Sequence, residues 1–93
     1  MQLVILNLRF KFKGDKHIEN TVETYLDSQI HPFLMRSNYQ IRIVVGKGIG
    51  SKKLFGGKNL LRVLTENYLR KLDLAWRNGN HFEGQEGVII VEG

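Results

Sequence analysis

The chain has 93 residues, 42% of them hydrophobic, and a formal net charge of +5 from 14 Lys and Arg against nine Asp and Glu. This length and hydrophobic content fit one folded domain, residues 1–93, and argue against a disordered chain. The absence of cysteine excludes disulfides and thiolate zinc sites and favours a reducing, cytoplasmic compartment. No apolar run approaches the roughly 18–20 residues that cross a bilayer, so no membrane span is expected.

The basic composition suggests a polyanionic partner. A sequence pI of about 9.8 favours RNA, DNA or an anionic membrane face, and general solubility is the alternative explanation. The three histidines, His17, His31 and His81, lack the spacing of a metal site. No metal and no cofactor are therefore expected.

The first half of the chain predicts a strand and a helix. Residues Leu3–Phe12 begin as a continuous apolar run and then alternate, which predicts a strand from the sheet interior that ends with a basic face. Asp15 is a candidate N-cap for a helix that begins near Lys16. Pro32 leaves two alternatives for its end. Either the helix ends near Ile30–His31, or it kinks and Pro32 starts a last turn.

The second half predicts three strands and a second helix. Gln40–Gly46 is a strand, and Gly46–Gly57 is a loop with five glycines and three lysines. A helix begins near Lys58 or Asn59 and carries an apolar stripe. Leu74–Arg77 is a short strand, and Gly87–Glu92 is an apolar final strand.

This order of elements predicts a two-layer α/β sandwich. Two consecutive right-handed β-α-β units place both helices on one face of a four-stranded mixed sheet, with the final strand antiparallel. The ends of the first two strands then lie side by side. Arg9, Lys11 and Lys13 would converge with the lysines of the glycine-rich loop. Phe10 and Phe12, between them, are expected in the core.

The glycine-rich loop does not match the strict nucleotide-binding motifs. A Walker A loop would need glycine at Lys52 and Ser or Thr at Asn59, and a dinucleotide fingerprint would need glycine at Ser51. A flexible Gly/Lys loop before a helix can still contact phosphates without reading sequence. The alternative is an ordinary surface loop whose glycines serve turns. No Ser/His/Asp or Cys/His catalytic set stands out.

A family resemblance follows from two segments. Ile41-Arg-Ile-Val-Val-Gly-Lys-Gly-Ile-Gly50 resembles the second signature of the small MutS-related (Smr) domain, written with H-G-K-G or T-G-R-G. Gly84–Glu92 is similar to that family's final strand. Leu6–Phe10 falls where the family has L-D-x-H-G. The resemblance implies a β-α-β-α-β-β fold like that of the C-terminal domain of bacterial translation initiation factor three. It also implies nucleic-acid binding and, in many members, endonuclease activity.

The first signature departs from the family pattern. Asn7 stands in place of the acid, Arg9 in place of the histidine and Phe10 in place of the glycine, while Val45 replaces the His or Thr of the second signature. Asn7 cannot act as a base, although Arg9 could hold a phosphate. The chain is therefore expected to bind nucleic acid and to cleave it weakly or not at all.

Three hypotheses follow. The first is a nucleic-acid-binding Smr-like domain that contacts RNA or DNA backbone and associates with the ribosome. The second is a retained endonuclease with Arg9 and Lys47 as electrostatic catalysts, and the third is a protein-interaction module. The predicted contact residues are Asn7, Arg9, Lys11, Gly46, Lys47, Gly48, Gly50, Lys52, Lys53 and Lys58.

Overall fold

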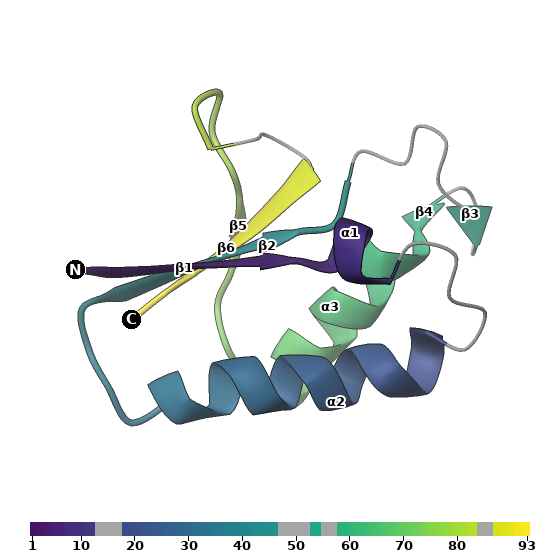
Figure 1. The fold of residues 1–93 in the computed structure, drawn as a ribbon. Helices are drawn as coiled ribbons and strands as arrows, with labels where there is room; N and C mark the ends of the chain where they lie inside the picture. The colour runs from purple at the N-terminus through teal and green to yellow at the C-terminus, as the bar shows by residue number, and fades with distance from the viewer. Residues whose placement is uncertain (13–17, 47–52, 55–57, 84–86) are drawn as a thin grey trace.

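The computed structural model describes residues 1–12, 18–46, 53–54, 58–83 and 87–93. Its main sheet contains β1 (Gln2–Asn7), β2 (Tyr39–Val44), β6 (Val88–Glu92) and β5 (Arg77–Asn78), in the spatial order β1-β2-β6-β5 (Figure 1). β1 and β2 are parallel, whereas β6 is antiparallel to both of its neighbours. A second, two-stranded sheet joins β3 (Lys53–Leu54) to β4 (Lys58–Asn59).

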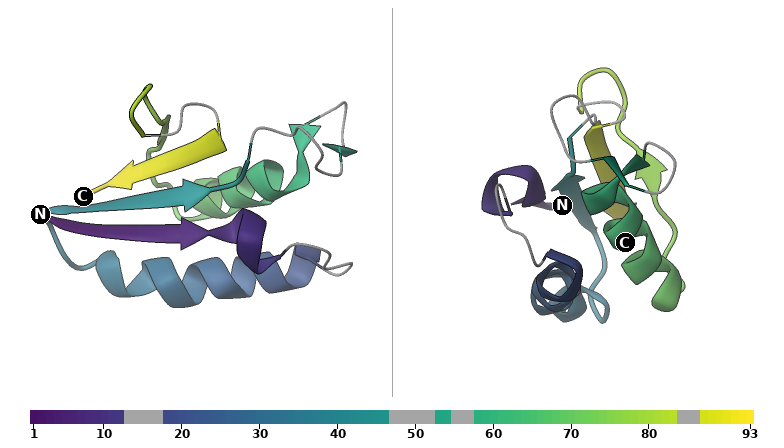
Figure 2. Two further views of the ribbon diagram at one scale, coloured as in Figure 1. Left: turned by 45° about the horizontal axis from the view of Figure 1, so that its top comes forward. Right: turned by 90° about the vertical axis from the view of Figure 1, so that its right-hand side faces the viewer.

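Two long helices form the second layer. α2 (Ile18–Ile30) follows β1, and α3 (Leu60–Lys71) lies between β2 and β5 in the chain. Both pack on the same face of the sheet and against each other (Figure 2). The predicted two-layer α/β class with a four-stranded mixed sheet is confirmed.

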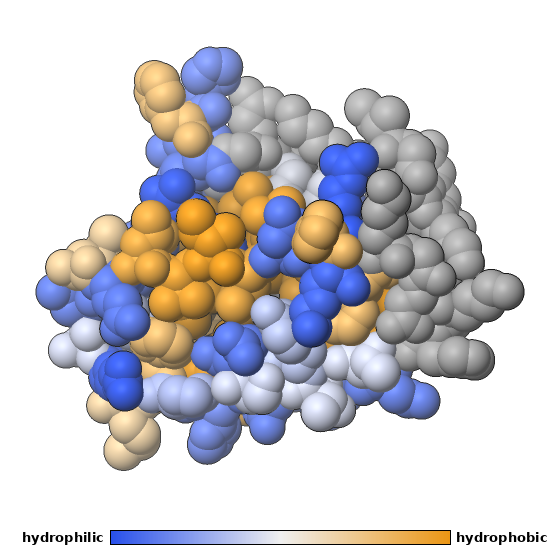
Figure 3. Space-filling model, in the orientation of Figure 1, coloured by the Kyte–Doolittle hydropathy of each residue, from blue (hydrophilic) through white to orange (hydrophobic). Residues whose placement is uncertain are grey.

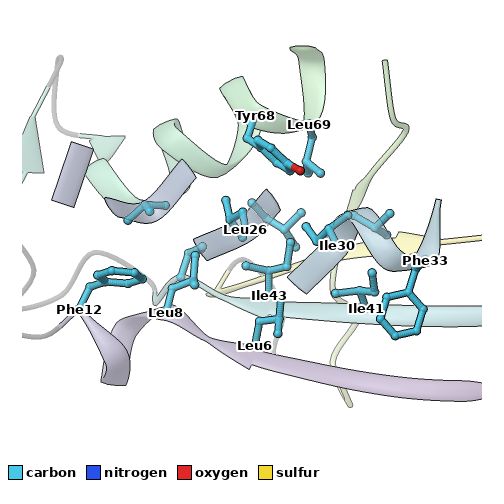
Figure 4. Close-up of a cluster of buried hydrophobic side chains, with 14 of the residues drawn as sticks. Leu6, Leu8, Phe12, Leu26, Ile30, Phe33, Ile41, Ile43, Tyr68 and Leu69 are labelled. Atoms are coloured by element: carbon cyan, nitrogen blue, oxygen red, sulfur yellow. The ribbon is translucent and has the colours of Figure 1, made fainter. Parts of the chain in front are cut away.

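The core lies between the sheet and these helices (Figure 4). Strand pairing aligns Leu6 with Ile43 and Ile43 with Ile89, so these three buried side chains share the face that the helices cover. α2 contributes residues four apart along its length, and α3 contributes Leu69. The buried residues of α2 are Val22, Leu26 and Ile30. This spacing places one stripe of the helix against the sheet.

The structure decides between the two predicted courses of the chain at Pro32. The α-helix ends at Ile30, and His31–Phe33 form a short 3-10 helix, η1, with the proline in its first turn. Proline is tolerated there because its missing N–H has no helical partner to lose. Phe33 is buried by this turn and packs against Tyr39, with ring centroids 5.5 Å apart.

The predicted first strand was wrong in two respects. The strand ends at Asn7, and Leu8–Lys11 form a helical turn, α1. β1 also lies at the sheet edge, so Leu3 and Ile5 are exposed, at 46% and 60%. Phe10 is 80% exposed instead of buried, because α1 directs it away from the core, while Phe12 is buried as predicted.

The predicted third strand was shifted. Only Arg77–Asn78 pair with β6, and Leu74–Trp76 lead up to them without strand geometry. β5 therefore pairs with just two residues of β6, Ile90 and Ile89.

The sheet face without helices is covered in part by charged side chains. Ile90 lies on this face between its pairing partners Arg42 and Arg77 and is 1% exposed. Glu83 approaches both arginines, at 4.0 Å and 2.8 Å, so this ion network links the two residues that pair with the isoleucine. Arg77 also pairs with Glu92.

Within the described parts of the chain, we find no helix with the length and apolar character of a bilayer span.

Candidate nucleic-acid interface

The carboxyl ends of β1 and β2 lie side by side, as predicted. Asn7 is the register partner of Val44 in a parallel pair, so the chain leaves both strands at the same end of the sheet, called here the basic edge. One exit leads into α1 and the segment 13–17, and the other leads through Gly46 into the glycine-rich loop. Figure 2 shows both exits at one end of the sheet.

Asn7 organises the first exit. Its side-chain oxygen accepts a hydrogen bond from the Phe10 N–H at 3.0 Å, which makes it the N-cap of α1. The turn buries Leu8 and Phe12, four residues apart, and leaves Arg9 and Lys11 exposed to solvent. The two cations are therefore presented at this edge by a helical turn, where the sequence predicted a strand face. The Asn7 oxygen is used for capping.

Gly46 organises the second exit. Its φ of +81° lies in the region that favours glycine, and a Cβ at this position would meet the Arg9 side chain at 3.0 Å from Cδ. Its N–H donates to the Gly87 carbonyl at 3.1 Å. The glycine thus allows the Arg9 side chain to lie directly over the end of β2. Val45, at the position of the second-signature His or Thr, is fully buried.

Asn59 connects this edge to α3, a role that the sequence pattern did not predict. Its side-chain amide donates to the carbonyls of Val45, at 2.5 Å, and Gly46, at 3.1 Å. Its side-chain oxygen accepts from the Leu61 N–H at 2.9 Å and caps the helix. One buried side chain therefore fixes both the end of β2 and the start of α3. An asparagine at a predicted helix start was the available signal.

Lys11 is held by aromatic rings. Its ammonium lies 4.6 Å from the ring centroid of Tyr25 on α2, and Tyr25 packs edge-on against Phe12. Such a cation–π contact restrains the lysine without neutralising it. Lys11 therefore remains a charge that can contact an anion.

Positive charge is concentrated in the two segments that leave this edge. Residues 9–16 and 47–58 contain eight of the 14 basic residues and one of the nine acidic residues, a net charge of +7. The chain as a whole carries +5, so the remainder is net negative at −2. The charge asymmetry of the sequence thus coincides with the two segments that follow β1 and β2.

The predicted contact residues lie only in part within the described ranges. Lys47, Gly48, Gly50 and Lys52 lie outside the described residues, as do Lys13 and the proposed N-cap Asp15. The backbones of Lys53 and Lys58 lie in the β3–β4 pair, which precedes α3 in the chain.

The described residues at this edge suit binding more than acid–base chemistry. Asn7, Arg9, Lys11, Gly46 and Asn59 supply cations and amides and no carboxylate or imidazole. A search of the described ranges finds no group of three or more His, Asp or Glu side chains with metal-site geometry.

Among the residues that the structure describes, the ionisable groups with perturbed pKa lie away from this edge. Hydrogen bonds from Arg77 and from the Asn80 N–H lower the pKa of Glu83 to about 2. Burial and a hydrogen bond to Asp27 raise the pKa of Tyr68 above its usual value. Both perturbations belong to contacts that hold elements together, away from the ends of β1 and β2.

Comparison of the chain with protein-family models, with curated proteins and with solved structures finds no match. The Smr resemblance therefore stays a prediction.

Proposed function

We propose that this chain binds the phosphate backbone of nucleic acid, RNA or DNA, at the edge where β1 and β2 end. The supporting observation is the net charge of +7 in the two segments that leave this edge, against −2 in the rest of the chain. Contacts to phosphates need cations and donors in place and need no base-specific geometry. The binding is therefore independent of sequence.

Arg9 and Lys11 make the described part of the contact. Arg9 lies over Gly46 and bridges the two exits, and Lys11 lies against Tyr25 with its charge intact. Lys47, Lys52, Lys53 and Lys58 add charge from the loop. The resemblance to Smr domains, and through them to the C-terminal domain of initiation factor three, implies the same ligand and includes ribosomal RNA among the targets.

Binding without cleavage is the form of this function that the residues favour. The side-chain oxygen of Asn7 caps α1, and an amide cannot serve as a general base. An endonuclease that uses Arg9 and Lys47 would need its general base from residues other than the described ones at this edge.

The test is a salt titration with matched charge variants. Fluorescence anisotropy measures the affinity for labelled single-stranded RNA and duplex DNA between 50 and 300 mM salt, values on the order of those used for such slopes. Arg9→Gln should weaken binding and reduce the slope of log affinity against log salt by about 0.7 on a single strand, the value of one phosphate contact. Arg36→Gln is the control, because Arg36 is also exposed but precedes β2, at the opposite end of the sheet.

An equal loss in both variants would show attraction by net charge alone and would refute the site. Affinity that does not change with salt would refute backbone binding altogether. The same samples, run on a denaturing gel, report cleavage. Products that persist in the double variant Arg9→Gln/Lys47→Gln would come from a contaminating nuclease.

A further inference from the structure

Phe10 is an exposed aromatic side chain at the basic edge. It is 80% exposed on α1, and among the described residues no aromatic ring or cation lies over its ring. Its N–H donates to the Asn7 side chain, so the bond that caps the turn also fixes the position of this residue. Figure 3 shows hydrophilic side chains over α1 with an apolar area among them. The ring therefore adds nothing to the core and is open to a ligand.

The surroundings of Phe10 differ from those of Phe82, the other exposed phenylalanine that the structure describes. Phe82 is 92% exposed, but its ring packs against that of His81, with centroids 5.4 Å apart, and the acidic Glu83 follows it in the chain. Phe10 has a cationic residue on each side in the chain. Exposed aromatic rings among cations are typical of surfaces that bind single-stranded nucleic acid, because bases stack on the rings and phosphates contact the cations.

The two cations diverge on either side of Phe10. Successive residues of a helical turn project about 100° apart, because one turn holds about 3.6 residues. Arg9 lies against Gly46 at the end of β2, and Lys11 lies against Tyr25 on α2. An oligonucleotide that crosses α1 would therefore meet one cation, then the aromatic ring, then the other cation.

A shallow groove continues this path between α1 and α2. Lys11 and Phe12 line it on one side, and Thr24, Tyr25 and Ser28 line it on the other. The two hydroxyl groups donate to carbonyls of α2, at 3.2 and 2.7 Å, so their oxygen atoms can still accept. None of the described lining residues carries a carboxylate, and Figure 3 shows weakly polar side chains of α2 as a pale area beneath α1. The nucleotide next to the ring would thus find acceptors and no repelling charge.

We propose that the basic edge takes single-stranded nucleic acid, with one unpaired base stacked on the Phe10 ring and the flanking phosphates at Arg9 and Lys11. This rests on the proposed function and names the form of its ligand. Stacking on a side chain needs a base face that no neighbouring base covers, and inside a duplex both faces are covered. A duplex could use the cations of this edge and not the ring. Because every base has a face that stacks, the ring selects unpaired nucleotides without reading sequence.

Fluorescence anisotropy with one labelled oligonucleotide, alone and in its duplex, tests the role of the ring. Phe10→Ala should weaken binding of the single strand by about five- to 140-fold, which corresponds to the value of about 1–3 kcal/mol for one stacked base. It should leave duplex binding and the salt slope unchanged, because no phosphate contact is lost. Phe82→Ala is the matched control and should change neither. RNA and DNA oligonucleotides of one sequence show which sugar the edge prefers.

Two further measurements separate stacking from general apolar contact. Phe10→Leu keeps an apolar side chain without an aromatic face, so it should lose most of the affinity that Phe10→Ala loses. An abasic oligonucleotide keeps the phosphates and lacks the bases, so it should bind the parent chain and Phe10→Ala equally. The indole introduced by Phe10→Trp should keep the affinity, and its fluorescence should be quenched by the single strand and not by the abasic one. Trp76 supplies only a constant background, because it lies next to β5 at the opposite edge of the sheet from β1.

The outcomes distinguish this inference from the function on which it rests. Salt-dependent binding that Phe10→Ala leaves unchanged, or weakens equally for single strand and duplex, would overturn the stacking and leave backbone binding in place. Full affinity in Phe10→Leu, or an equal loss in Phe82→Ala, would also overturn it. Absence of salt-dependent binding to every oligonucleotide would overturn both proposals.

Discussion

The side chain of Asn59 provides the sharpest test of how the candidate interface is built. It donates to the carbonyls of Val45 and Gly46 and accepts from the Leu61 N–H. Loss of an N-cap costs about 0.5–2 kcal/mol. A buried polar group that loses its partner costs about 1–3 kcal/mol. Asn59→Ala should therefore reduce the free energy of unfolding by about 2–4 kcal/mol.

For a domain of this size, such a loss lowers the melting temperature by about 10–30 °C, because 1 kcal/mol corresponds to about 4–8 °C. Urea unfolding and calorimetry both measure it. Asn59→Asp separates the two roles: aspartate has the same shape and still caps the helix, but it sets a carboxylate against two carbonyl oxygens. We expect Asp to be as destabilising at pH 7 as Ala. An Asp variant as stable as the parent chain would refute the contact between the amide and the end of β2.

Two further predictions concern Gly46 at the end of β2 and Glu83 on the sheet face without helices. Gly46→Ala should destabilise the fold by about 1–2 kcal/mol in urea unfolding, since alanine resists a φ of +81°, whereas Gly79→Ala, at a glycine without positive φ, should cost less. Because Arg77 depresses the pKa of Glu83 to about 2, the stability from that carboxylate is present above its unfolded pKa of about 4.5 and is lost as pH falls toward 2. Melting temperatures from pH 7 to 2 should show this loss, Glu83→Gln should remove that part of the slope, and an unchanged slope would contradict it.

The position of the basic edge was predictable from the chain order alone. A strand, a helix and a second strand joined by a right-handed crossover place two parallel strand ends together, and the sequence puts its basic residues directly after both strands. The structure confirms the neighbouring ends of β1 and β2. The contacts that shape the edge were not predictable, because the partners of Asn59 are 13 and 14 residues away in the chain.

The residue pattern led to a wrong prediction for residues 8–12, because their spacing fits a strand and a helix. Leu8 and Phe12 are four residues apart, which suits one face of a strand and one face of a helical turn equally. The side chain of Asn7 decided between them by capping the turn, and Phe10 consequently became exposed. Apolar composition also could not tell an edge strand from a central one, since Leu3 and Ile5 have the same residue types that fill a sheet interior.

The sequence by itself determined the class of fold, the helical stripes of α2 and α3, the buried strands β2 and β6, and the asymmetric placement of charge. Those features depend on residues close together in the chain, where periodicity and composition are sufficient. Only the tertiary structure decided that β1 lies at the edge of the sheet, that Arg9 lies against Gly46, and that Glu83 pairs with both Arg42 and Arg77. Each of these depends on strand order and on contacts between distant residues, which local pattern does not encode.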